Sequence, residues 1–160
     1  MWNQRRSIRL NTAPTPAEET MKPGTEPSIL TTAFYAFYDL HRPAYHAYAA
    51  AHLPPQEALI TVTHVFELIA STWTSVVTTP RPSAWAWDKH TQAIARRTGR
   101  TTTPAQDTVL LHDTLRLSID QIATITGTDD ASVAALLAAG RRAGWSLPSR
   151  CLSGGGPRRR

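Results

Sequence analysis

The chain has 160 residues, of which 41% are hydrophobic, and this length suits one domain of moderate size or two small ones. No apolar stretch reaches the roughly 18 residues of a membrane span, and the first residues lack the apolar run of a signal peptide. The single cysteine, Cys151, excludes an internal disulfide and any cysteine-based metal cluster. These features predict a cytoplasmic protein that does not enter a membrane.

The net charge of +5 belongs to the ends of the chain. Residues 29–146 hold nine basic and nine acidic residues, so the excess lies in residues 1–28 and 147–160. Residues 1–28 are rich in Pro, Thr and Glu, which predicts a disordered N-terminal tail. Residues 147–160 predict a basic flexible tail that either solubilises the end or touches nucleic acid or an acidic partner. The neutral body does not by itself indicate nucleic-acid binding.

Residues 29–100 predict three helices. Aromatic residues recur every three or four positions from Phe34 to Tyr48, and Pro43 is expected to kink or restart that helix. Pro54 and Pro55 predict the start of a second helix. Its expected core face is Ala58, Leu59, Val62, Val65, Phe66, Ile69 and Trp73.

After a loop at residues 78–82, Ser83 is expected to cap a third helix that runs to about Arg97. A short linker at residues 99–103 leads to three further helical segments, at roughly 104–116, 119–126 and 130–143. Ser118 is the expected cap of the middle segment, Gly127 its end, and Asp129 or Asp130 the cap of the last. No alternating strand pattern occurs, so the predicted fold class is all-α, with two small helical modules at 29–100 and 104–146.

The second module has helix-turn-helix spacing. Ala123 is small where the two helices would cross, and Gly127 supplies the positive φ of a tight turn. An ordinary three-helix bundle would show the same periodicity.

Residues 104–143 resemble region 4, the C-terminal promoter-reading module of bacterial sigma factors of the extracytoplasmic-function type. The resemblance lies in Val109-Leu110-Leu111, in the run from Leu117 to Ala123, in Gly127, in Val133 and in Gly140-Arg141-Arg142. The first module resembles region 2 of the same family, through Phe34 to Tyr48, Glu57-Ala58, Val62, Val65-Phe66, Trp85 and Ile94-Ala95-Arg96.

This resemblance implies a transcription regulator that contacts the RNA polymerase core and promoter DNA and needs no cofactor. The residues that it points to for DNA contact are Trp85, Trp87, Lys89, Arg96, Arg97, Arg100, Arg141 and Arg142. Trp85 and Trp87 lie about 200° apart on a helix, so one of them is expected to face outward and to stack on a base. Core packing beside a solvated basic helix end is the alternative interpretation of the same residues.

The last helix departs from the family pattern. Its expected solvent face carries Ala131, Ala135, Ala138 and Arg142, flanked by Ala134 and Arg141, whereas base edges are read by Arg, Lys, Asn or Gln. Residues 104–145 hold three bases against five acids, and Asp129 and Asp130 stand where the family approaches DNA. DNA binding through this helix is therefore expected to be weak or absent.

The second helix departs as well, because the places where the family's polymerase-binding helix carries acidic and amide residues hold Leu59, Ile60, Thr63 and His64. The residues that point away from the core face are Ile60, His64, Glu67 and Leu68. Exposed apolar side chains there predict a surface for a protein partner, and scattered surface hydrophobes are the alternative. The linker from Arg97 to Ala105 spans at most about 27 Å. That favours two modules packed together over the separated modules of a working sigma factor.

Two functions remain open from the sequence. The chain is either a sigma-factor-like transcription regulator, or a degenerate sigma-like module that binds a protein, such as an anti-sigma factor or polymerase itself, and not DNA. No nucleophile elbow or phosphate-binding glycine loop occurs, so we expect no enzyme. The six histidines show no ligand spacing, so we expect no metal site.

Overall fold

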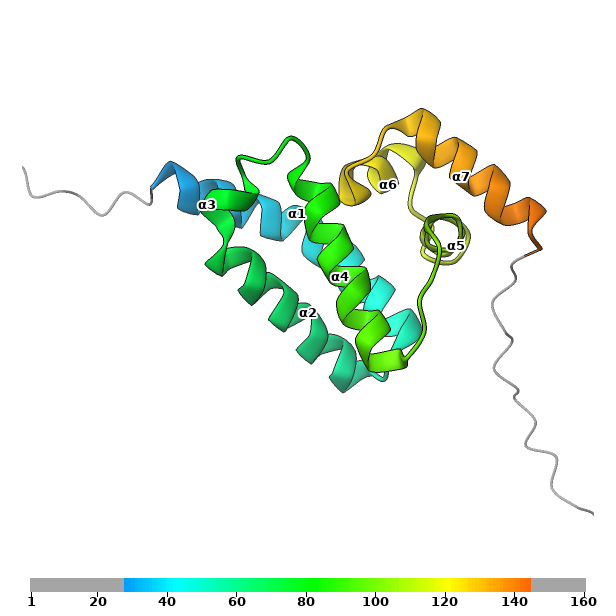
Figure 1. The fold of residues 1–160 in the computed structure, drawn as a ribbon, viewed down its shortest axis with the longest axis horizontal. Helices are drawn as coiled ribbons and strands as arrows, with labels where there is room; N and C mark the ends of the chain where they lie inside the picture. Colours follow the sequence, from blue (N-terminus) through cyan, green and yellow to red (C-terminus); the bar gives the residue numbers. More distant parts are fainter. Residues whose placement is uncertain (1–27, 145–160) are drawn as a thin grey trace, which may run out of the picture.

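The computed structural model describes residues 28–144, and these residues are helical and contain no strand (Figure 1). The all-α prediction is therefore confirmed for this part of the chain. The helices are α1 (Ile29–His52), α2 (Pro55–Ser71), α3 (Trp73–Val76), α4 (Pro82–Thr98), α5 (Pro104–Val109), the π-helical turn η1 (Leu110–Thr114), α6 (Ile119–Thr126) and α7 (Asp130–Arg142). No helix in this range combines the length and apolarity needed to cross a membrane. The predicted N-terminal and C-terminal tails lie outside the described residues, apart from Ser28.

Helix α1 runs without a break through Pro43, so the predicted restart at this residue is wrong. A proline lacks the N–H that would bond the carbonyl of Asp39, four residues earlier. Both Pro43 and Asp39 are exposed, so water can reach the carbonyl that the proline leaves unpaired. The helix therefore continues at small cost, while its opposite face is buried.

The aromatic residues of α1 are buried to different degrees along the helix. Phe34, Phe37 and Tyr38 are only half-buried, whereas Tyr45 and Tyr48 are fully buried. The aromatic stripe thus places its later residues at the centre, because α2 and α4 both cover this end of α1. Figure 1 shows α1 behind α4, with α2 alongside.

Helix α2 begins at Pro55, as predicted, and buries Ala58, Val62, Val65, Phe66 and Ile69. Leu59 does not belong to the core, because 46% of its side chain is exposed. Successive helical residues are rotated by about 100°, and this rotation carries Leu59 past the edge of the buried stripe toward α1. Trp73 is buried but lies in α3, after a break at Thr72.

Helix α4 starts at Pro82, and Ser83 is not its cap. The Ser83 hydroxyl instead lies 3.0 Å from Nε2 of His41 on α1. Nδ1 of His41 lies 2.8 Å from the carbonyl of Phe37, which can only accept, so Nδ1 carries the proton and Nε2 accepts from Ser83. The Ser83 hydroxyl, which the sequence predicted to cap α4, thus forms its hydrogen bond with the buried His41 instead.

The second half of the described chain ends its helices as the sequence predicts. Ser118 forms a capping box with Gln121, Gly127 terminates α6 with φ 67°, and the Asp129 carboxylate accepts from the N–H of Ser132 at 2.8 Å. The predicted 104–116 helix is α5 followed by the π-helical turn, and Arg116 ends it with a left-handed φ of 61°.

Two glycines permit close helix contacts. At Gly140 of α7, an added Cβ would lie 2.7 Å from the carbonyl oxygen of Ala105, so α7 rests directly on α5. At Gly127, an added Cβ would overlap the backbone of Ala84 in the first turn of α4. This second contact joins the two halves, and buried apolar residues from both form one continuous core.

Candidate interaction surfaces

The outer face of α2 carries the residues that the sequence predicted to point away from the core. Ile60 and Leu68 are 45% and 43% exposed, and His64 and Glu67 are exposed between them. Leu59 adds a third exposed apolar side chain to the same helix, which sequence reasoning missed by placing it in the core.

Leu59 borders a groove of about 280 Å³ between α1 and α2. The groove is lined mainly by apolar and aromatic side chains, with Arg42 and Glu67 among its polar residues. The guanidinium of Arg42 lies 5.6 Å from the centre of the Tyr38 ring. The groove between α1 and α2 therefore combines apolar area with charges of both signs.

The tryptophans of α4 differ from the expectation that one of them faces outward, because both are half-buried. Trp87 packs between Tyr45 and Tyr48, with ring centroids 5.5 and 4.9 Å away, and so belongs to the core. Trp85 lies at the surface end of the core, with the ammonium of Lys89 5.5 Å from its ring. Of the two, Trp85 has the basic neighbour, and the Lys89 ammonium also lies 3.7 Å from the carboxylate of the exposed Asp88.

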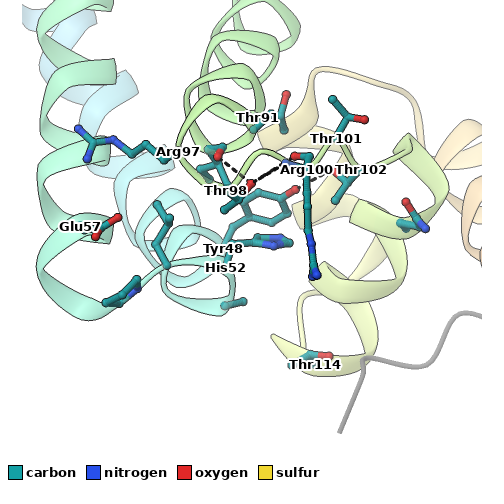
Figure 2. A pocket seen from close by; sticks show the side chains of 16 residues that line it. Tyr48, His52, Glu57, Thr91, Arg97, Thr98, Arg100, Thr101, Thr102 and Thr114 are labelled. Atoms are coloured by element: carbon teal, nitrogen blue, oxygen red, sulfur yellow. Dashed lines mark hydrogen bonds between the residues drawn. The ribbon is translucent and has the colours of Figure 1, made fainter. Parts of the chain in front are cut away.

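The basic residues at the end of α4 fall into two sets. Arg96, Arg97 and Arg100 are all exposed, and none forms an ion pair with another described residue. Arg97 and Arg100 line a cleft of about 1130 Å³, whereas Arg96 does not (Figure 2). The structure thus brings two of the predicted basic residues together at one concave site.

This cleft lies where the end of α1, the start of α2, the end of α4 and the segment before α5 meet. Figure 2 shows Tyr48 and His52 side by side at its centre, with ring centroids 4.7 Å apart. The Tyr48 hydroxyl donates to the buried Asp107 carboxylate at 2.6 Å and lies 3.2 Å from the Thr102 hydroxyl. Burial raises the pKa of Asp107, and burial lowers the pKa of His52.

Helix α7 exposes the alanines that the sequence placed on its outer face: Ala131, Ala134, Ala135 and Ala138. Arg141 is engaged, because its guanidinium donates to the Asp113 carboxylate and holds the pKa of Asp113 well below its usual range. Arg142 is then the only basic residue of α7 without an ion pair in the described chain. Sequence reasoning could not find the Arg141–Asp113 pair, since 28 positions separate the partners.

Two histidines that carried no sequence signal are core residues. His41 is buried as described, and His90 is fully buried, with its ring stacked on Tyr45 at 4.4 Å. Burial lowers the pKa of His90 to about 3, so the ring is neutral. Among residues 28–144, no group of three or more His, Cys, Asp or Glu side chains is placed to hold a metal ion.

Comparison with known proteins finds no family model, no curated protein and no solved structure that matches this chain.

Proposed function

We propose that this chain is a sigma-factor-like transcription regulator that binds the RNA polymerase core through the outer face of α2. The observation that carries this proposal is the exposure of Ile60 and Leu68 on the face opposite the core stripe. The resemblance of this segment to the family's polymerase-binding helix supplies the identity of the partner. The proposed regulator acts in the cytoplasm and needs neither catalysis nor a cofactor.

The chemistry of α2 supports a protein partner over a purely solvated face. Each large apolar side chain that leaves water at an interface contributes free energy in proportion to its buried area. Ile60 and Leu68 would provide that area, and the intervening His64 and Glu67 would select a partner through polar contacts. An anti-sigma factor is the other partner that the resemblance suggests for such a face.

Promoter contact, in this proposal, occurs through the first module. Trp85 and Lys89 offer a ring and a cation at the surface of α4, and Arg96 adds an exposed cation on the same helix. Aromatic stacking on an unpaired base contributes roughly 1–3 kcal/mol and does not require a particular sequence. Trp87 contributes to this surface only indirectly, because it packs against Tyr45 and Tyr48.

A second candidate function is a sigma-like module that binds a protein and not DNA. The surface of α7 favours it, because the helix exposes alanines, begins with Asp129 and Asp130, and has Arg141 tied to Asp113. Base recognition needs several hydrogen-bonding side chains on one face. With Arg142 alone at its far end, α7 lacks them.

The polymerase proposal is tested by capture of purified core polymerase on the immobilised full chain. Ile60→Asp with Leu68→Asp is expected to abolish capture and to leave the helical content unchanged, since both side chains are exposed. Leu40→Asp is the matched control, because Leu40 is 57% exposed on α1 and lies outside the proposed face. Unchanged capture by the double variant would refute the α2 interface.

The choice between the two functions is tested by fluorescence anisotropy of the full chain, at physiological salt, with a pool of duplexes that each contain an unpaired stretch. The second candidate predicts weak, salt-sensitive binding without sequence preference. Tighter binding that weakens in Trp85→Ala would support promoter contact through the first module. Selection of one motif with nanomolar affinity, lost in Arg142→Gln, would exclude the second candidate and restore a promoter-reading α7.

A further inference from the structure

We infer that the cleft around Tyr48 and His52 binds a small phosphorylated ligand of the nucleoside diphosphate class. This inference goes beyond the proposed function, because it assigns a ligand to a concave site that neither polymerase nor a promoter duplex would fill. It rests on the charges, the free hydrogen-bonding groups and the shape of the cleft.

The charges that line the cleft favour an anion. Arg97 and Arg100 flank the central rings from opposite sides in Figure 2, and Glu57 is the one carboxylate in the lining. Neither arginine is paired with an acid of residues 28–144. A guanidinium presents a planar set of N–H donors that matches a phosphate in a two-point contact. Two such groups suit a ligand with more than one phosphate oxygen to bind.

Neutral hydrogen-bonding groups around the cleft are also left without partners. Nε2 of His52 is buried and has no hydrogen-bond partner in the described part of the chain. A buried polar atom without a partner costs free energy, and because almost none of the Nε2 surface is accessible, a ligand bonds to it only once the His52 ring turns toward the cleft. The hydroxyls of Thr101 and Thr114 also line the cleft and are exposed, and neither is engaged with another described residue.

The shape and the apolar lining favour a ligand that carries a ring. Leu53, Pro54 and Ile94 provide apolar wall, and Tyr48 and His52 provide aromatic surface. The volume of about 1130 Å³ exceeds what phosphate alone would occupy and reaches the size of ligand-binding clefts in general. A duplex is convex, so its phosphates would meet the arginines at the rim without reaching His52 at the centre.

The position of the cleft links ligand binding to the packing of the two halves. Tyr48 of α1 holds Asp107 of α5 through a buried hydrogen bond, and Gln106 of α5 is part of the lining. A ligand that contacts both sides is expected to stabilise this junction, because binding to the folded chain alone raises its stability.

The test titrates the full chain with ADP, inorganic phosphate and adenosine, and follows binding by calorimetry and by thermal melting. ADP is expected to bind saturably and to raise the melting temperature, with phosphate and adenosine each binding more weakly than ADP. Arg97→Gln with Arg100→Gln is expected to weaken ADP binding by at least about tenfold, the loss of one or two charged contacts. Arg96→Gln, on the same helix but outside the cleft, is the matched control and should change the affinity by less than about twofold.

Three results would overturn the inference. The first is an absence of saturable ADP binding at millimolar concentration by a chain whose circular dichroism is that of a folded helical protein. The second is an equal loss of ADP affinity in Arg96→Gln and in the double variant, which would indicate that ADP is attracted by the overall positive charge and does not bind at the cleft. The third is displacement of ADP by duplex DNA that binds more tightly and loses affinity in the same variants, which would assign the arginines to DNA phosphates.

Discussion

The helices α1–α4 and the helices α5–α7 build their cores from different side chains, and their surfaces differ accordingly. The first half packs large aromatic and histidine rings, among them Tyr45, Tyr48 and His90. The second half packs aliphatic residues, with Gly140 drawing α7 onto α5. Both hollows described above lie beside α1, which carries Tyr45 and Tyr48. Helix α7, which packs closely on α5, instead exposes four alanines on its outer face.

The comparison teaches where recognition can arise in this chain. Exposed apolar side chains collect on α2, and arginines without an ion pair among residues 28–144 lie at the end of α4 and in the cleft, all beside the aromatic core. On α7 the polar groups are engaged internally, because Asp129 caps the helix and Arg141 pairs with Asp113. The half for which the sequence predicted a DNA-reading module is thus the half with fewer groups left to bind a partner.

The largest effect is expected from breaking the aromatic core. Phe66→Ala removes a buried ring that contacts Tyr38 and Tyr45, with centroids 4.7 and 5.5 Å away, and should lower the free energy of unfolding by about 3–5 kcal/mol. Leu59→Ala on the same helix should cost less than about 1 kcal/mol, because that side chain is exposed. Denaturant melts measure both, and equal losses would show that α2 is rotated relative to this structure.

The next largest loss of stability is expected from a substitution at Gly140, where α7 lies directly against α5. Gly140→Val would force side-chain atoms into the backbone of Ala105, and should cost about 2–3 kcal/mol through separation of α7 from α5. Ala135→Val on the exposed face of α7 reports only the helix propensity of valine, and should cost about 0.5 kcal/mol. If the two variants melt alike, α7 does not rest on α5 at Gly140.

Lowering the pH should destabilise the first half more than the second, because the fully buried histidines, His41 and His90, belong to the first half. The pKa of His90 falls from 6.5 to about 3 on folding, so below pH 6.5 the unfolded chain binds a proton that the folded chain does not. Its contribution to stability is complete above pH 6.5 and is lost as the pH falls toward 3. The loss at pH 5 is about 2 kcal/mol.

Burial lowers the pKa of His41 in the same direction, whereas the raised pKa of Asp107 favours the folded state in acid. His90→Phe isolates the single group, and should lose about 2 kcal/mol less than the natural chain between pH 7 and pH 5. His46→Gln, at an exposed position, should keep the natural slope. Parallel pH profiles for the natural chain and His90→Phe would show that His90 is accessible to protons.

The smallest change in stability is expected at Arg116, which ends the π-helical turn in a strained backbone conformation. Arg116 adopts a φ of 61°, and the N–H of Leu117 bonds the carbonyl of Leu111 at 3.1 Å, in the manner of a helix that ends on glycine. Arg116→Gly should therefore stabilise the chain by about 0.5–1 kcal/mol. Ala134→Gly, at an exposed position in the interior of α7, should destabilise it by a similar amount. A loss of stability in Arg116→Gly would mean that the arginine side chain makes a stabilising contact.

The sequence by itself determined the helices, most of their ends and their outer faces. Capping by Ser118 and Asp129, the stop at Gly127 and the helix start at Pro55 depend on atoms within four residues of one another along the chain. The alanine face of α7 and the exposure of Ile60 and Leu68 follow from the helical repeat alone. Local geometry is the same wherever the helix lies, so these features could be predicted without the fold.

Only the tertiary structure decided which groups from distant segments share an environment. Ser83 bonds His41 across 42 positions, Tyr48 bonds Asp107 across 59, and Arg141 reaches back to Asp113. Pro43 stays within a helix because its exposed side faces water, and Leu59 leaves the core because of where α1 crosses α2. The cleft with Arg97 and Arg100 exists only where four segments meet. Such contacts depend on how helices cross, and the crossing is determined by the summed packing of many side chains that no single stretch of sequence contains.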